Sequence, residues 1–124
     1  MSTFGDDLMN KCMSFSVRIV ELYKRLTEEQ KEFVLSKQLL RSATSIGANL
    51  AEAQSAISGK DFIAKAYISL KESAESLYWI ELLHRTKYLS EADYVLYKRD
   101  CEELKKLFVS ITKTFNENTR KHNS

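Results

Sequence analysis

Glu81 and His84 are the residues of this sequence whose spacing most resembles a metal site. They form a Glu-x-x-His pair, which carboxylate-bridged di-metal bundles use twice, together with two further glutamates. The other histidine, His122, is near the end of the chain. With one such pair, the sequence predicts a structural role for His84 and no metal site.

Other catalytic patterns are missing from the sequence. It has no glycine-rich phosphate loop and no zinc-ligand spacing, and no histidine is placed to activate a serine. The acidic pairs Glu28/Glu29 and Glu102/Glu103 fall at solvated positions of predicted helices. We therefore expect a protein that is not an enzyme, with no catalytic residues and no cofactor.

Two rows of basic side chains are candidates for nucleic-acid contact. The rows consist of Lys11, Arg18 and Arg25, and of Arg99, Lys106, Lys113 and Arg120. A seven-residue spacing drifts only about 20° per step on a helix, so each row lies along one edge and could follow a phosphate backbone. The alternative is an ordinary solvated face, because Glu103 and Glu117 follow basic residues by four positions.

The composition indicates one helical domain. The chain has 124 residues, no proline and three glycines, which argues against a turn-rich β fold. Its net charge of +2 is too small to imply nucleic-acid binding by itself. Cys12 and Cys101 fall on apolar stripes and are expected to be core thiols. The N-terminal segment does not resemble a signal peptide and no apolar run is long enough to span a membrane, so we expect a cytoplasmic protein.

Apolar residues recur with helical periodicity in four segments. The expected helices cover residues 9–26, 27–56, 60–86 and 91–117. Capping patterns support three of the starts; they are Thr27 with Gln30, Ser58 with Asp61, and Ser90 with Asp93. We predict an all-α, antiparallel up-down-up-down four-helix bundle over residues 9–117, with a flexible N-terminus (1–8) and a polar C-terminal tail (118–124).

The third predicted helix has two apolar stripes. One contains Ile63, Ala66, Leu70, Ala74 and Leu77, and the other contains Ala64, Ile68, Trp79 and Leu82. A polar wedge of Lys65, Ser69, Glu72 and Ser76 separates them. The second stripe could contact a neighbouring helix of the same bundle. We favour an oligomer interface formed by Ile68, Trp79 and Leu82, because apolar patches on outer faces mark contacts.

The second predicted helix has a polar stripe of Gln38, Ser42, Ser45, Asn49 and Glu52. It could be a solvated face, but serine is a poor helix former at exposed positions. We therefore favour a semi-buried polar seam, and Gly47 would allow a close helix approach there. The expected partners of Asn49 or Glu52 are Arg41, Lys71, Glu72 and Glu75.

The run from Arg41 to Glu52 resembles the signature of a bacterial family, the 23S rRNA intervening-sequence proteins. The signature Ser-Ile-x-x-Asn-[Ile/Leu]-Ala-Glu is matched by Ser45, Ile46, Asn49, Leu50, Ala51 and Glu52. Residues 69–83 and 15–23 look like the family's third and first helices. Ala53 departs from the pattern, since many members have glycine there.

The resemblance implies a four-helix bundle that assembles as a homopentamer around a channel. Some members are encoded inside 23S rRNA genes, and a related, strongly basic branch assists a retroelement reverse transcriptase. The near-neutral charge of this chain departs from that branch. The function expected from the resemblance is RNA or ribosome-associated binding by a ring-shaped homo-oligomer. The alternative is a structural or adaptor oligomer that binds another protein, for example a nucleic-acid enzyme.

Overall fold

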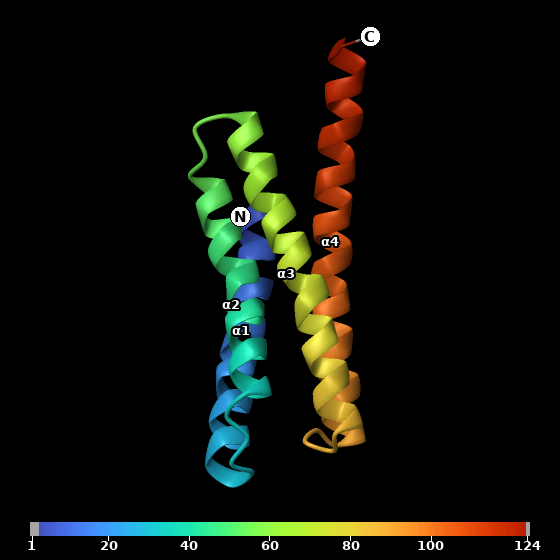
Figure 1. The fold of residues 1–124 in the computed structure, drawn as a ribbon. Helices are drawn as coiled ribbons and strands as arrows, with labels where there is room; N and C mark the ends of the chain where they lie inside the picture. The colour runs from blue at the N-terminus through green and yellow to red at the C-terminus, as the bar shows by residue number, and fades with distance from the viewer. Residues whose placement is uncertain (1–2, 124) are drawn as a thin grey trace.

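The computed structural model describes residues 3–123, with the side chains of residues 3–118. Its four helices are α1 (Phe4–Glu29), α2 (Leu35–Gln54), α3 (Gly59–Arg85) and α4 (Glu91–Asn123). Each helix packs against the next, and α1 also packs against α4, so the four form a closed antiparallel bundle (Figure 1). The described residues contain no strand, and the predicted all-α four-helix bundle is confirmed.

The core-facing sides of α1 and α2 are those that the apolar periodicity predicts. On α1 the buried residues include Cys12, Phe15, Ile19, Leu22 and Leu26. On α2 they include Leu39, Ala43, Ile46, Leu50 and Ala53. Both cysteines are buried and unpaired, so the prediction of core thiols is confirmed. Burial raises the pKa of the Cys12 and Cys101 thiols to about 12, and buried thiols of this kind are unreactive.

The inward side of α3 is not the apolar stripe that the sequence predicts. Ser69, Ser73 and Ser76 are fully buried, whereas Ala74 is exposed. The apolar residues Leu77 and Trp79 lie on the flanks and are half-buried. The prediction was wrong because α3 packs tightly against both α2 and α4, and small serine side chains occupy the centre of that double contact.

The connection between α1 and α2 also differs from the prediction. Thr27 does not cap a new helix; its hydroxyl donates to the Tyr23 carbonyl at 2.9 Å, inside α1. The chain turns at Lys31, whose φ of 55° is left-handed. The Glu32 N–H then donates to the Leu26 carbonyl at 3.0 Å and closes the end of α1.

Glu32 supplies the missing cap for α2. Its carboxylate accepts hydrogen bonds from three backbone N–H groups, those of Val34 at 3.0 Å, Leu35 at 2.8 Å and Ser36 at 2.7 Å. The residue is only 7% exposed. Burial alone would raise its pKa, but the N–H donors of Ser36, Leu35 and Val34 and the Ser36 hydroxyl outweigh that effect, so the pKa of Glu32 lies below its ordinary value.

The starts of α3 and α4 follow the predicted caps. The Ser58 hydroxyl accepts from the Asp61 N–H at 3.1 Å, and the Ser90 hydroxyl accepts from the Asp93 N–H at 3.2 Å. The outer ends differ from the expected limits, because α1 already begins at Phe4 and α4 continues to Asn123. In Figure 1 the end of α4 rises past the turn that joins α2 to α3.

The Glu32 cap predicts a pH-dependent contribution to stability. At pH 7 Glu32→Gln should lower the free energy of unfolding by about 1–2 kcal/mol, because the charged acceptor of three N–H donors is lost. A carboxyl with a lowered pKa stabilises the fold above its ordinary pKa of 4.5 and loses that effect as the pH falls through the folded value. The difference in the free energy of unfolding between wild type and Glu32→Gln should therefore shrink towards zero as the pH falls.

Urea unfolding at several pH values measures this difference in the free energy of unfolding. Glu29→Gln is the matched control, since Glu29 is exposed and lies in the last turn of α1. An equal effect of both substitutions at pH 7, or a gap that stays constant into acid, would contradict the role of Glu32.

Candidate nucleic-acid interface

The basic row on α1 is neutralised by carboxylates of α4. Each of its three cations forms an ion pair across the contact between the two helices. The pairs are Lys11–Glu103 at 2.6 Å, Arg18–Asp100 at 2.6 Å and Arg25–Asp93 at 2.7 Å. We name this set the α1–α4 ion-pair ladder. Because these cations face carboxylates, they are poorly placed to attract a phosphate backbone.

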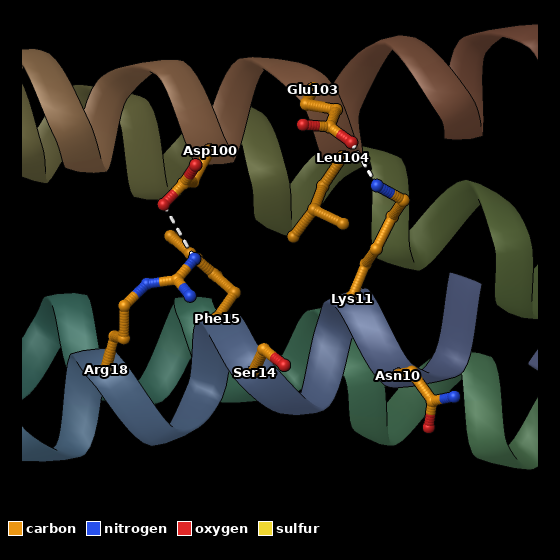
Figure 2. Close-up of a pocket in the computed structure, with 8 residues that line it drawn as sticks. All are labelled: Asn10, Lys11, Ser14, Phe15, Arg18, Asp100, Glu103 and Leu104. Atoms are coloured by element: carbon orange, nitrogen blue, oxygen red, sulfur yellow. Dashed lines mark hydrogen bonds and ion pairs between the residues drawn. The ribbon is translucent and has the colours of Figure 1, made fainter. Parts of the chain in front are cut away.

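Figure 2 shows the middle of the ladder. Lys11 and Arg18 extend from α1 towards α4, and the apolar side chains of Phe15 and Leu104 lie between the two ion pairs. The hollow that these residues line has a volume of about 290 Å³. Since both cations at its edge are already paired, it offers no unneutralised charge to a ligand.

The sequence carries a signal for the ladder in its acidic residues. Asp93 and Asp100 repeat with the same seven-residue spacing as Arg18 and Arg25. In an antiparallel pair of helices, two such rows of opposite charge can face each other in register. Glu103 pairs with Lys11 and not with Arg99, which lies four residues before it.

The basic row on α4 has a different environment. Arg99 approaches the Asp100 carboxylate at 3.6 Å. Lys106 and Lys113 are exposed, and among residues 3–118 neither forms an ion pair. The Arg120 side chain lies outside the described side chains. The row on α4 therefore keeps positive charge that the row on α1 does not.

Two more lysines extend this positive surface. Lys98 is exposed, with its amine 5.4 Å from the centre of the Tyr94 ring, and Lys105 is half-buried. Lys105 and Lys106 line one hollow together with Leu77 of α3. We name this surface the α3–α4 face, and its main residues are Leu77, Val95, Lys98, Arg99, Lys105, Lys106, Val109 and Lys113.

The polar seam of α2 lies along its contact with α3 but is paired differently from the prediction. Glu52 forms an ion pair with Lys65 at 2.8 Å. The Asn49 amide donates to the Ser45 carbonyl of its own helix at 2.8 Å. The seam is only partly enclosed, since Ser42 is buried, Ser45 and Asn49 are half-buried, and Glu52 is exposed.

Arg41 connects α2 to two glutamates of α3. Its guanidinium pairs with Glu72 at 3.3 Å and also with Glu75. The Trp79 indole N–H donates to the same Glu75 carboxylate at 3.0 Å. The hydrogen bond from Trp79 is the largest cause that lowers the pKa of Glu75 below its ordinary value, and the pairing with Arg41 acts in the same direction. Partial burial acts in the opposite direction but is outweighed. This network joins the motif residue Arg41 to Trp79.

The serines beneath this network are all hydrogen-bonded. The hydroxyls of Ser42 and Ser76 lie 2.9 Å apart, and the Ser69 hydroxyl donates to the Ile46 carbonyl at 2.8 Å. Among the described residues no buried side-chain nitrogen or oxygen lacks a partner. The serines therefore bind α3 to α2 and leave no polar atom for a ligand.

Gly47 of the motif allows a close approach of α2 to α1, on the other side. A Cβ at this position would lie 3.1 Å from the Cβ of Cys12 and 3.5 Å from the Met9 methyl carbon. The motif run thus contributes to packing in two directions, with Gly47 towards α1 and Ser42 towards α3.

The predicted interface residues of α3 are half-buried within a single chain. Ile68, Trp79 and Leu82 all have intermediate exposure, and Trp79 also packs against the core. Their use as a contact between copies stays a prediction.

Glu81 and His84 are each bound to other side chains. Glu81 accepts from the Tyr94 hydroxyl at 2.7 Å and pairs with Arg85 at 3.0 Å. His84 lies 2.8 Å from a Glu91 oxygen and stacks on the Tyr94 ring at 3.8 Å. In the described part of the chain no three metal-ligating side chains lie together. The pair therefore joins the end of α3 to the start of α4.

The fold and these surfaces define a small antiparallel four-helix bundle with charged outer faces. No described helix is both long enough and apolar enough to cross a membrane. The sequence matches the model of the 23S rRNA-intervening sequence protein family over residues 6–110. The chain therefore belongs to this family.

A solved relative has the same fold. It is a protein with unknown function from the S23 ribosomal protein family of Bacteroides thetaiotaomicron, known from a crystal structure. The two chains are 52% identical and superpose with a TM-score of 0.86, over 88% of this chain and 97% of the relative. Among curated proteins, none matches this chain.

Proposed function

We propose that this protein is a non-enzymatic, cytoplasmic, RNA-associated homo-oligomer that binds RNA through the basic row of α4. The observation that carries the proposal is the contrast between the two rows. The α1–α4 ion-pair ladder occupies the cations of α1, whereas Lys106 and Lys113 of α4 stay exposed and without an ion pair among the described side chains. A row of unpaired cations attracts phosphates by releasing their counterions.

The candidate RNA contacts lie on one side of the bundle. Lys98 and Lys105 add to the charge of Arg99, Lys106 and Lys113 on the α3–α4 face. Glu102 also lies on this face and offsets one of these charges. The remaining excess is small, so the binding should be moderate and sensitive to salt.

A homo-oligomer would increase this binding. We propose that copies associate through Ile68, Trp79 and Leu82 of α3 and form a ring, which the family resemblance implies to be a pentamer. A ring repeats the basic row of α4 once for each subunit. Several moderate contacts on one RNA molecule then act together and raise the overall affinity.

An RNA titration between about 50 and 200 mM salt tests the binding surface. Lys106→Glu should weaken the binding of a labelled structured RNA by at least about tenfold, and Lys106→Gln should reduce the slope of log affinity against log salt by about one. Lys24→Glu is the matched control, because Lys24 is exposed on α1 and carries the same charge. It should bind almost as wild type does.

Two results would overturn this assignment. Absence of binding at the lowest salt would remove RNA as the ligand. An equal loss in Lys24→Glu and Lys106→Glu would show an effect of net charge without a defined surface.

Light scattering of the purified protein tests the assembly. Trp79→Glu and Leu82→Glu should each lower the measured mass towards that of one chain, because a carboxylate would be buried in the contact. Ala74→Glu is the control, since Ala74 is exposed on another side of the same helix. Circular dichroism checks that each variant is folded. Folded variants of unchanged mass would rule out this interface.

A second candidate function rests on a separate surface. Met13 and Val17 of α1 are 57% and 49% exposed, and Val20 follows at helical spacing. Exposed apolar residues in one stripe favour a protein partner, as expected of an adaptor. Such a partner would stay bound at high salt and in Lys106→Glu, whereas RNA would be released.

A further inference from the structure

Two hollows lie on the α3–α4 face. The larger, of about 530 Å³, is lined by Tyr94, Val95, Lys98 and Arg99 among others. The smaller, of about 270 Å³, is lined by Leu77, Lys105 and Val109. Lys106 and Glu102 line both hollows. The basic row of α4 is therefore not a flat strip of charge, because it borders two concave sites.

The walls of these hollows contain exposed apolar side chains, which contact with phosphates alone would not require. Val95 is 51% exposed and Val109 is 44% exposed. Tyr94 of the larger hollow is half-buried. Apolar groups beside unpaired cations offer contacts to both the bases and the phosphates of a nucleic acid.

We infer that the α3–α4 face recognises single-stranded RNA, with phosphates on Arg99, Lys106 and Lys113 and unstacked bases in the two hollows. This inference rests on the proposed function and specifies its substrate class. A duplex presents its phosphates to the row but keeps its bases stacked inside, so it would leave the apolar walls uncovered. A single strand presents both groups at once.

The dimensions of the face fit a short strand. At 1.5 Å per residue, Arg99 and Lys113 are separated by about 21 Å along α4. This length corresponds to about six nucleotides at the 3.4 Å spacing of stacked bases, and to fewer when the strand is extended. Glu102, between the hollows, could accept a hydrogen bond from the amino group of a base.

Fluorescence anisotropy with the full-length protein and two probes tests the inference. The probes are a labelled 12-nucleotide oligouridine and a labelled 12-base-pair RNA duplex, at the same salt concentration. The single strand should bind at least about tenfold more tightly, although the duplex has about twice as many phosphates. Equal or tighter binding of the duplex would overturn the inference.

Variants separate base contacts from phosphate contacts. Val95→Ser and Val109→Ser should each weaken oligouridine binding by about fivefold or more without changing the salt slope, because neither removes a charge. Val17→Ser is the control, since Val17 is an exposed valine on α1, and it should bind as wild type does. Circular dichroism verifies the fold. Unchanged oligouridine affinity in both folded variants would contradict base contact at this face.

The results also distinguish the two proposals. Duplex binding that depends on Lys106 but not on Val95 or Val109 would leave the RNA-binding function in place and overturn the single-strand inference. Failure of both probes to bind at about 50 mM salt would overturn both.

Discussion

The close packing of α3 against both α2 and α4 is the constraint on which the rest of the bundle depends. Ser69, Ser73 and Ser76 occupy the centre of this double contact and are fully buried. Their small side chains allow the helices to approach, and local or interhelical hydrogen bonds satisfy their hydroxyls. Buried hydroxyl groups without such partners would destabilise the fold.

This packing also decides what the outer faces display. Ser69, Ser73 and Ser76 share the inward side of α3 with Ala66, Ile80 and Leu83. Other large apolar residues of α3 therefore lie on its flanks. Trp79 is on the flank beside α2, where it contacts Glu75. Leu77 is on the flank beside α4, where it lines a hollow with Lys105 and Lys106. Both surfaces that we connect with function thus follow from the small residues at the centre.

The contact between α1 and α4 determines which basic side chains stay unpaired on the surface. The α1–α4 ion-pair ladder joins residues that are mostly part-exposed, and pairs of this kind add little to stability. Their main consequence is electrostatic, since they neutralise the cations of α1 and the acidic edge of α4 together. What remains on α4 is the outward row at Lys106 and Lys113. A net charge of +2 is therefore compatible with one locally positive face.

The sequence predicted the features that depend on local patterns. The caps at Ser58 and Ser90 and the core stripes of α1 and α2 were correct, because capping and helical periodicity are properties of short segments. The inward side of α3 was missed because a serine that bonds within its own helix can be buried. The Glu32 cap requires the left-handed turn at Lys31, and the ladder requires the register between distant helices. Neither can be derived from spacing alone.

Lysine footprinting tests the central claim, that this charge distribution leaves α4 as the RNA-binding helix. The protein is treated with an amine-modifying reagent with and without single-stranded RNA at low salt, and modification is quantified by mass spectrometry. The account predicts protection of Lys98, Lys105, Lys106 and Lys113, with unchanged modification of Lys24 on α1 and Lys37 on α2. Equal protection of all these lysines, or protection confined to Lys24 and Lys37, would contradict it.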